Sequence, residues 1–127
     1  MNDEHRANLR RVADALGVEA KFDMNEWINE AEDGCGTAAC IGGTTELLFK
    51  PADTHWQSIG KLLGLKGSAA SALFFPQIGG WPSAYRPTGA SPYKATAAQA
   101  AALLRDIADG KVVFDEDARR FVMAEAS

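Results

Sequence analysis

The sequence predicts a mainly all-α domain: a compact bundle of five or six short helices with one long Pro/Gly/aromatic loop. Apolar residues recur at helical spacing in several segments, capping signatures precede those segments, and glycine or proline follows them. The pattern also allows one short two-stranded β-ribbon. A length of 127 residues, 46% of them hydrophobic, suits one globular domain over residues 1–127.

The first predicted helix begins at Glu4, with Asp3 as its cap, and stops at Gly17. Its core-facing side is expected to hold apolar residues at i, i+3, i+4 and i+7: Leu9, Val12, Ala13 and Leu16. The following segment is less regular. Residues 22–24 are expected to be extended, and residues 25–30 to form a short helix that turns Trp27 inward.

A cysteine- and glycine-rich string occupies residues 35–43. Thr37 is a plausible N-cap for a helix over residues 37–49, which Pro51 stops. Gly42 and Gly43 would then lie inside this helix, at a cost of about 1 kcal/mol each relative to alanine. This cost indicates that another helix, a loop or a ligand packs close to the backbone there.

Two capping boxes define further helices. Thr54 and Gln57 open a helix with a core-facing Trp56, and residues 68–75 form another short helix. Thr96 and Gln99 open the most regular helix, whose apolar side comprises Ala100, Leu103, Leu104 and Ile107. Residues 111–114 are expected to form a short strand that can pair with the region of Phe22. Asp115 is expected to cap a last helix that carries Ala118, Phe121 and Val122.

The segment 76–94 is a loop rich in proline, glycine and aromatic residues. Loops of this length in small domains are usually functional or disordered, and the aromatic residues argue against disorder. The loop residues either close the core or line a binding groove. We expect a non-catalytic binding or accessory module, in which the loop and the glycine-rich segment form the site: Gly36, Thr37, Gly42, Gly43, Trp81, Tyr85, Arg86 and Tyr93.

The competing prediction is a thiol-dependent enzyme of the cysteine hydrolase type. Cys35 would lie at a helix N-terminus, where the helix dipole favours the thiolate, and His55 is the realistic general base. Reversible oxidation of Cys35 with Cys40 is a third prediction. The spacing of cysteine and histidine gives only a weak zinc signature, so neither a metal nor another cofactor is expected.

Charge and hydropathy narrow the class of partner. The net charge is −4 and the basic residues are scattered, so nucleic-acid binding is not expected. No apolar run resembles a signal sequence or a membrane span, which predicts a cytoplasmic protein without membrane contact. The expected partner is a protein or a small molecule whose identity the sequence does not specify.

The string Cys35-Gly36-Thr37-x-x-Cys40-Ile41-Gly42-Gly43 resembles a motif of small bacterial and phage proteins with no assigned function. The motif reads C-G-T-x-x-C-[IL]-[AG]-G, and the resemblance covers roughly residues 22–76. A tryptophan or histidine often follows the second glycine in that group, where this chain has Thr44. The resemblance implies a shared domain and no particular chemistry.

Overall fold

The computed structural model describes residues 1–18, 21–25, 27–30, 37–77, 79–87 and 91–124, without the side chains at 29, 30, 37 and 38. Five α-helices account for most of the regular structure in this part of the chain: α1 (Asp3–Ala15), α2 (Ile41–Phe49), α3 (Trp56–Leu62), α4 (Gly67–Phe74) and α5 (Ala97–Ala108). The strands are β1 (Lys21–Phe22), β2 (Ile28–Glu30), β3 (Thr37–Ala39), β4 (Val112–Asp115) and β5 (Arg120–Met123).

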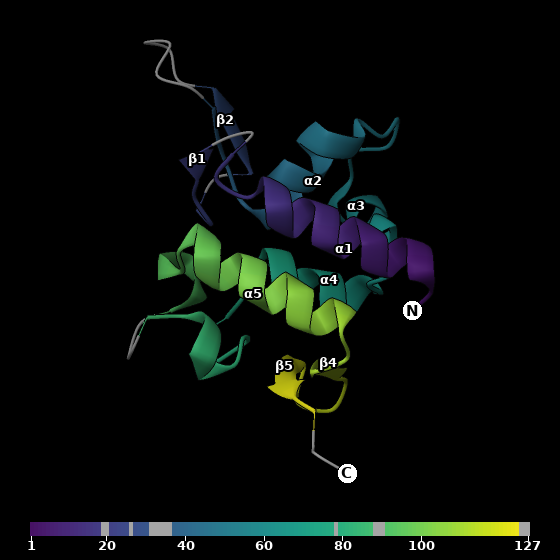
Figure 1. The fold of residues 1–127 in the computed structure, drawn as a ribbon, viewed down its shortest axis with the longest axis vertical. Coiled ribbons are helices and arrows are strands. Elements are labelled where there is room, and N and C mark those ends of the chain that lie inside the picture. Colours follow the sequence, from purple (N-terminus) through teal and green to yellow (C-terminus); the bar gives the residue numbers. More distant parts are fainter. Residues whose placement is uncertain (19–20, 26, 31–36, 78, 88–90, 125–127) are drawn as a thin grey trace.

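The helices form the centre of the molecule, and a small sheet lies at each end (Figure 1). One sheet has three strands in the order β1-β3-β2, and the other is the β4–β5 hairpin. The prediction of a mainly helical protein with a short β-ribbon is confirmed, although two sheets mean that the fold is not strictly all-α. None of the helices in the described ranges is long and apolar enough to cross a membrane.

Helices α1 and α5 lie side by side and run antiparallel (Figure 1). Two ion pairs connect them, Arg10 with Asp109 at 2.7 Å and Arg105 with Asp14 at 2.8 Å. The apolar sides predicted for both helices are confirmed, because these residues are all buried in one core: Leu9, Val12, Ala13, Leu16, Ala100, Leu103, Leu104 and Ile107. The capping box of α5 is also confirmed, with Thr96 accepting from the Gln99 amide at 3.1 Å.

The region before α2 forms strands where helix was predicted. The expected short helix over residues 25–30 is wrong, because β2 begins at Ile28 and pairs antiparallel with β3. Thr37 is not a helix cap but the first residue of β3. Cys40 is the N-cap of α2, and its Sγ accepts a hydrogen bond from the Gly43 amide at 3.4 Å. Strand pairing therefore displaces the helix start by about one turn.

The C-terminal helix predicted after Asp115 is also wrong. Residues 112–115 form the expected strand, but it pairs with β5 and not with the region of Phe22. The Asp115 carboxylate accepts from the amides of Asp117 and Ala118 at 3.0 and 3.1 Å. These bonds resemble an N-cap but here close a tight turn, and Arg119 leaves it with a φ of 55°.

Candidate functional site

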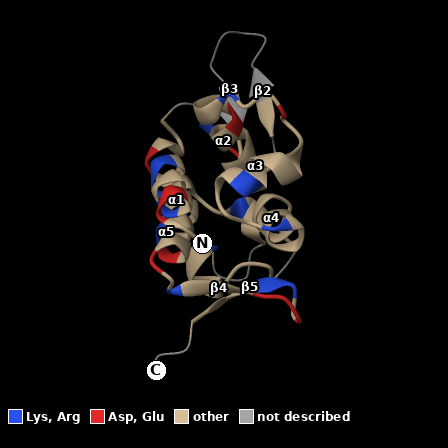
Figure 2. Ribbon diagram, turned by 90° about the vertical axis from the view of Figure 1, so that its right-hand side faces the viewer, with Lys and Arg blue, Asp and Glu red and all other residues tan. Residues whose placement is uncertain are grey.

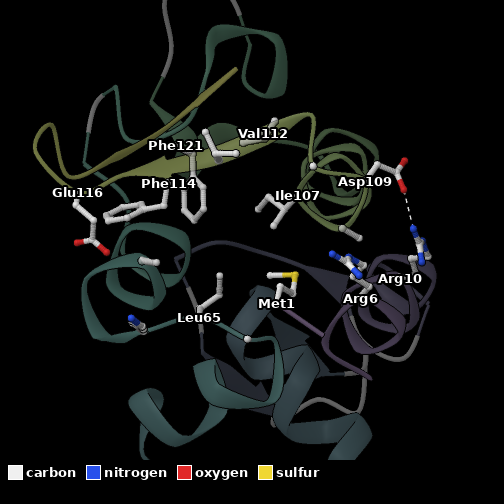
Figure 3. Close-up of a pocket in the computed structure, with 16 residues that line it drawn as sticks. Met1, Arg6, Arg10, Leu65, Ile107, Asp109, Val112, Phe114, Glu116 and Phe121 are labelled. Atoms are coloured by element: carbon white, nitrogen blue, oxygen red, sulfur yellow. Dashed lines mark hydrogen bonds and ion pairs between the residues drawn. The ribbon is translucent and has the colours of Figure 1, made fainter. Parts of the chain in front are cut away.

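A cavity of about 840 Å³ lies between the helices and the β4–β5 hairpin (Figure 3). Its volume is within the range of about 300–1,000 Å³ that is usual for small-ligand sites. Four separate segments line this open cavity: the start of the chain with α1, the turn into α4, the end of α5, and the hairpin. The lining residues are Met1, Arg6, Arg10, Gly64, Leu65, Lys66, Ala69, Ile107, Ala108, Asp109, Gly110, Val112, Val113, Phe114, Glu116 and Phe121.

The inner surface of the cavity is largely apolar. Phe114 and Phe121 point into it from the hairpin, and Leu65 points into it from the opposite side (Figure 3). The two phenylalanine rings make an edge contact with centroids 5.3 Å apart, which fixes their orientation. Leu65 and Phe121 are buried in the core, so the base of the cavity is preformed and continuous with the interior.

Charged side chains surround this apolar base. Asp109 is bound by Arg10 at 2.7 Å, and this hydrogen bond holds the pKa of the Asp109 carboxyl below its usual range. Glu116 accepts a hydrogen bond from the Ser68 hydroxyl at 3.2 Å. Both acidic side chains of the lining therefore already have partners within the described residues.

The remaining cations of the lining are less constrained. Arg6 contacts Asp3 at 3.1 Å, but the Asp3 side chain is fully exposed, so water competes strongly for this pair. Lys66 is exposed at the N-cap position of α4, where its side chain makes no capping hydrogen bond. The cavity thus combines an apolar interior with two cations that an anionic group can reach at its edge.

Gly42 and Gly43 of the predicted binding site contact the protein itself. A Cβ at Gly42 would lie 2.3 Å from ring atoms of Trp27, and a Cβ at Gly43 would lie 1.4 Å from the Trp27 carbonyl oxygen. Trp27 donates from Nε1 to Glu46 at 3.2 Å and stacks on Phe75. The close approach predicted from the glycines is therefore present, and its occupant is the segment that leads into β2.

Cys40 is a structural residue in this arrangement. Its thiol is buried at 2% exposure and accepts from the Gly43 amide. Burial raises the pKa of the Cys40 thiol above its ordinary value, although the Gly43 hydrogen bond opposes that shift. A buried and protonated thiol is a poor nucleophile. Cys35 and Gly36, the first two residues of the cysteine motif, lie outside the described residues.

His55, and not the predicted Thr54, is the N-cap of α3, and it is exposed to solvent. Its ring Nδ1 accepts from the Gln57 amide at 3.3 Å, and the ring stacks on Trp56 with centroids 5.7 Å apart. Among the described contacts of His55, none is with a sulfur atom. The predicted pairing with Cys35 stays a prediction, because Cys35 is not described.

The aromatic residues of the 76–94 loop face inward. Trp81 is 1% exposed and donates from Nε1 to the Ala72 carbonyl at 3.2 Å, and Tyr85 is 4% exposed. Arg86 is half-buried and donates to the Trp81 carbonyl at 3.4 Å, while Tyr93 is half-buried against the core. Of the two roles considered for this loop, the described contacts favour closing the core.

The cavity residues were not selected by the sequence analysis. The sequence pattern predicts that Arg6 is an exposed helix residue and that Phe121 lies on the core-facing side of a helix. The available signal was a pair of apolar triplets, 112–114 and 121–123, separated by six mostly charged residues that include Asp115. That pattern is typical of a hairpin and would have placed Phe114 and Phe121 on one face.

Comparisons with known proteins assign no relative to this chain. No model of a known protein family matches the sequence, and searches of curated proteins and of solved structures give no significant match.

Proposed function

We propose that this protein is a non-catalytic binding module whose ligand is a small apolar molecule that carries one anionic group. The observation that supports this function is the cavity of about 840 Å³ between α1, α5 and the hairpin, with its apolar base and cationic edge. The proposal keeps the class of function expected from the sequence. It moves the site from the glycine-rich segment and the 76–94 loop to the cavity.

The apolar interior favours a ligand with an aliphatic or aromatic body. Phe114, Phe121, Leu65 and Ile107 offer aromatic and branched aliphatic surfaces on opposite sides of the space. Burial of apolar surface contributes about 25 cal/mol per Å². A ligand body that covers roughly 100 Å² of this surface would therefore gain about 2.5 kcal/mol before the entropy of association is subtracted.

The edge of the cavity favours a negative charge on the ligand. Asp109 and Glu116 are already hydrogen-bonded, whereas Arg6 and Lys66 are accessible. A carboxylate, sulfonate or phosphate could accept hydrogen bonds from the Arg6 guanidinium while its apolar body remains in the cavity. A cationic ligand would meet repulsion from both side chains.

The lining also supports a role without catalysis. The described residues around the cavity include no cysteine, histidine, serine or threonine, so the pairing of a nucleophile with a base is not available there. The two carboxylates, Asp109 and Glu116, are each held by a neighbouring side chain. Binding is therefore the function that these residues support best.

Calorimetric titration with three probes that share a ten-carbon chain tests the proposal. Decanoate is expected to bind at one site, decanol more weakly, and decyltrimethylammonium most weakly. Only decanoate combines a chain that suits the apolar interior with a negative charge that suits the cationic edge. Arg6→Gln should weaken decanoate binding about fivefold, or ~1 kcal/mol, while decanol binding is unchanged. Lys94→Gln, which removes an exposed charge outside the cavity lining, serves as the matched control.

A second variant tests the cavity itself. Ala69 is 6% exposed and lines the space, so Ala69→Phe should fill part of it and reduce the affinity for both decanoate and decanol. Equal binding of all three probes, or decanoate binding that survives Ala69→Phe in a folded protein, would contradict the proposal.

A further inference from the structure

A second, smaller cavity of about 300 Å³ lies where β5 meets the first part of the 76–94 loop. Residues from the segment 79–86 form one wall, and residues 120–123 of β5 form the other. The Phe121 amide donates to the Gly80 carbonyl at 2.9 Å, so a backbone hydrogen bond joins the two walls. The volume is at the lower end of the range of about 300–1,000 Å³ that is usual for small-ligand sites.

The charge of this smaller cavity is opposite to that of the whole chain. Its described lining holds two arginines, Arg86 from the loop and Arg120 from β5, and no aspartate, glutamate, histidine or lysine. The chain as a whole has a net charge of −4. A hollow lined by charges of one sign concentrates ligands of the other sign. The lining therefore favours an anionic ligand.

Arg86 is held at the wall of the smaller cavity by its own loop. Its Nε donates to the Trp81 carbonyl at 3.4 Å, and Trp81 is itself part of the lining. The Trp81 ring is buried, and its Nε1 donates to the Ala72 carbonyl at 3.2 Å. The buried tryptophan of the loop thus closes the core and also fixes the position of an arginine at the cavity.

Arg120, on the opposite wall, is exposed, and none of the ion pairs among the described residues includes it. Asp115 lies opposite Arg120 in the β4–β5 ladder. One oxygen of the Asp115 carboxylate accepts from the amides of Asp117 and Ala118, and Asp115 is not part of the cavity lining. The Arg120 guanidinium is therefore available to a ligand.

We propose that the smaller cavity binds the phosphate group of a small phosphate monoester. Arg86 and Arg120 offer guanidinium groups from the two walls, and the exposed Ser83 lies in the lining between neutral residues. Guanidinium groups match the geometry of phosphate oxygens and form charge-assisted hydrogen bonds with them. A phosphate monoester carries about −1.5 to −2 charges near neutral pH, which suits two arginines better than the single charge of a carboxylate.

This inference does not depend on the ligand proposed for the larger cavity. Among the described lining residues the two cavities share only Phe121. The larger cavity has its own cations, Arg6 and Lys66. A test must therefore identify which arginines respond to phosphate.

An NMR titration of the whole protein with phenyl phosphate, at constant ionic strength, makes this distinction. The side-chain Nε–H signals of Arg86 and Arg120 should shift together and saturate with one affinity, while the Arg6 signal should not. Inorganic phosphate should shift the same two signals with lower affinity, because it lacks the organic body, and acetate should bind most weakly. Shifts at Arg6 without Arg86 and Arg120, or acetate binding as tight as that of phenyl phosphate, would overturn the proposal. Equal affinities for the two phosphates would overturn the assignment of a monoester.

Two neighbouring substitutions separate the cavity from the general charge of the hairpin. Arg120→Gln should weaken the binding of phenyl phosphate about fivefold. Arg119→Gln is the matched control, because Arg119 is also exposed but does not line the smaller cavity. It removes the same charge one residue away and should weaken binding less than about twofold. Equal effects of the two substitutions would contradict a defined site.

The pH dependence of the affinity gives a test on the unaltered protein. A phosphate monoester loses its second proton near about pH 6, whereas arginine stays protonated. The affinity for phenyl phosphate should therefore rise between about pH 5 and about pH 8. An affinity that does not change over this range would overturn the recognition of a doubly charged phosphate.

Discussion

Replacement of Gly43 by alanine is expected to destabilise the protein by about 1–3 kcal/mol. The new Cβ would lie 1.4 Å from the Trp27 carbonyl oxygen, whereas ordinary contact begins near 3.4 Å. The Trp27 backbone must therefore move away by roughly 2 Å, because the clashing atom belongs to the main chain and not to the end of a flexible side chain.

The magnitude follows from the contacts that this retreat would disturb. Trp27 would lose its hydrogen bond to Glu46, worth about 1 kcal/mol, and its ring contacts with Phe74 and Phe75, worth about 0.5–1.5 kcal/mol each. The higher helix propensity of alanine offsets at most about 1 kcal/mol of this loss. For a chain of this length a net loss of about 1–3 kcal/mol lowers the melting temperature by about 3–15 °C.

Thermal and urea denaturation followed by circular dichroism measure this effect. Gly67→Ala is the matched control, because its Cβ would meet only the Gln57 side chain, at 3.7 Å, at the start of α4. The control should be neutral or slightly stabilising. Equal stability of Gly43→Ala and the parent would refute the packing of the Trp27 segment against the first turn of α2.

Three further outcomes are expected. Burial, together with the 2.5 Å hydrogen bond to Asp106, raises the pKa of Tyr85. The protonated Tyr85 hydroxyl therefore stabilises the folded protein fully below about pH 10, and this stabilisation is lost at higher pH. Tyr85→Phe should flatten the alkaline part of the curve of unfolding free energy against pH. The Thr44 hydroxyl is buried without a hydrogen-bond partner among the described residues, so Thr44→Val should stabilise the protein by about 1 kcal/mol in urea titrations. Iodoacetamide should label Cys40 at least about 100-fold more slowly in the native than in the unfolded protein, as read by mass spectrometry; rapid native labelling would contradict its structural role.

The helices with complete local signals could be predicted from the sequence. In α5 the capping box of Thr96 and Gln99, the apolar spacing and the terminal Gly110 all agree, and the structure reproduces each of them. The glycines of α2 were equally informative. Their cost in a helix predicted a close neighbour, and Trp27 occupies that position.

The predictions failed at the strands, where one local sequence signal is compatible with two structures. An aspartate that accepts from amides two and three residues ahead caps a helix or closes a turn, and Asp115 does the second. Strand β2 is only three residues long and depends on pairing with β3, which begins seven residues after β2 ends. Such long-range pairing leaves no periodic pattern in the segment 28–30.

The cavity could not be predicted because no single segment encodes it. Arg6, Leu65, Ile107 and Phe121 come from four distant parts of the chain, and each has an ordinary local role in a helix, turn or strand. Only the antiparallel packing of α1 on α5, with the β4–β5 hairpin below them in Figure 2, brings these side chains around one space.

Methyl NMR during a decanoate titration tests the central claim of cavity binding most directly. Leu65, Ile107, Val112 and Val113 line the cavity, so their methyl signals should shift together and saturate with one affinity. Leu48, which packs against the core from α2 and does not line the cavity, should stay unchanged. Decanoate shifts that leave the four lining residues unaffected, or that appear only near Trp27 and Phe75, would contradict the account.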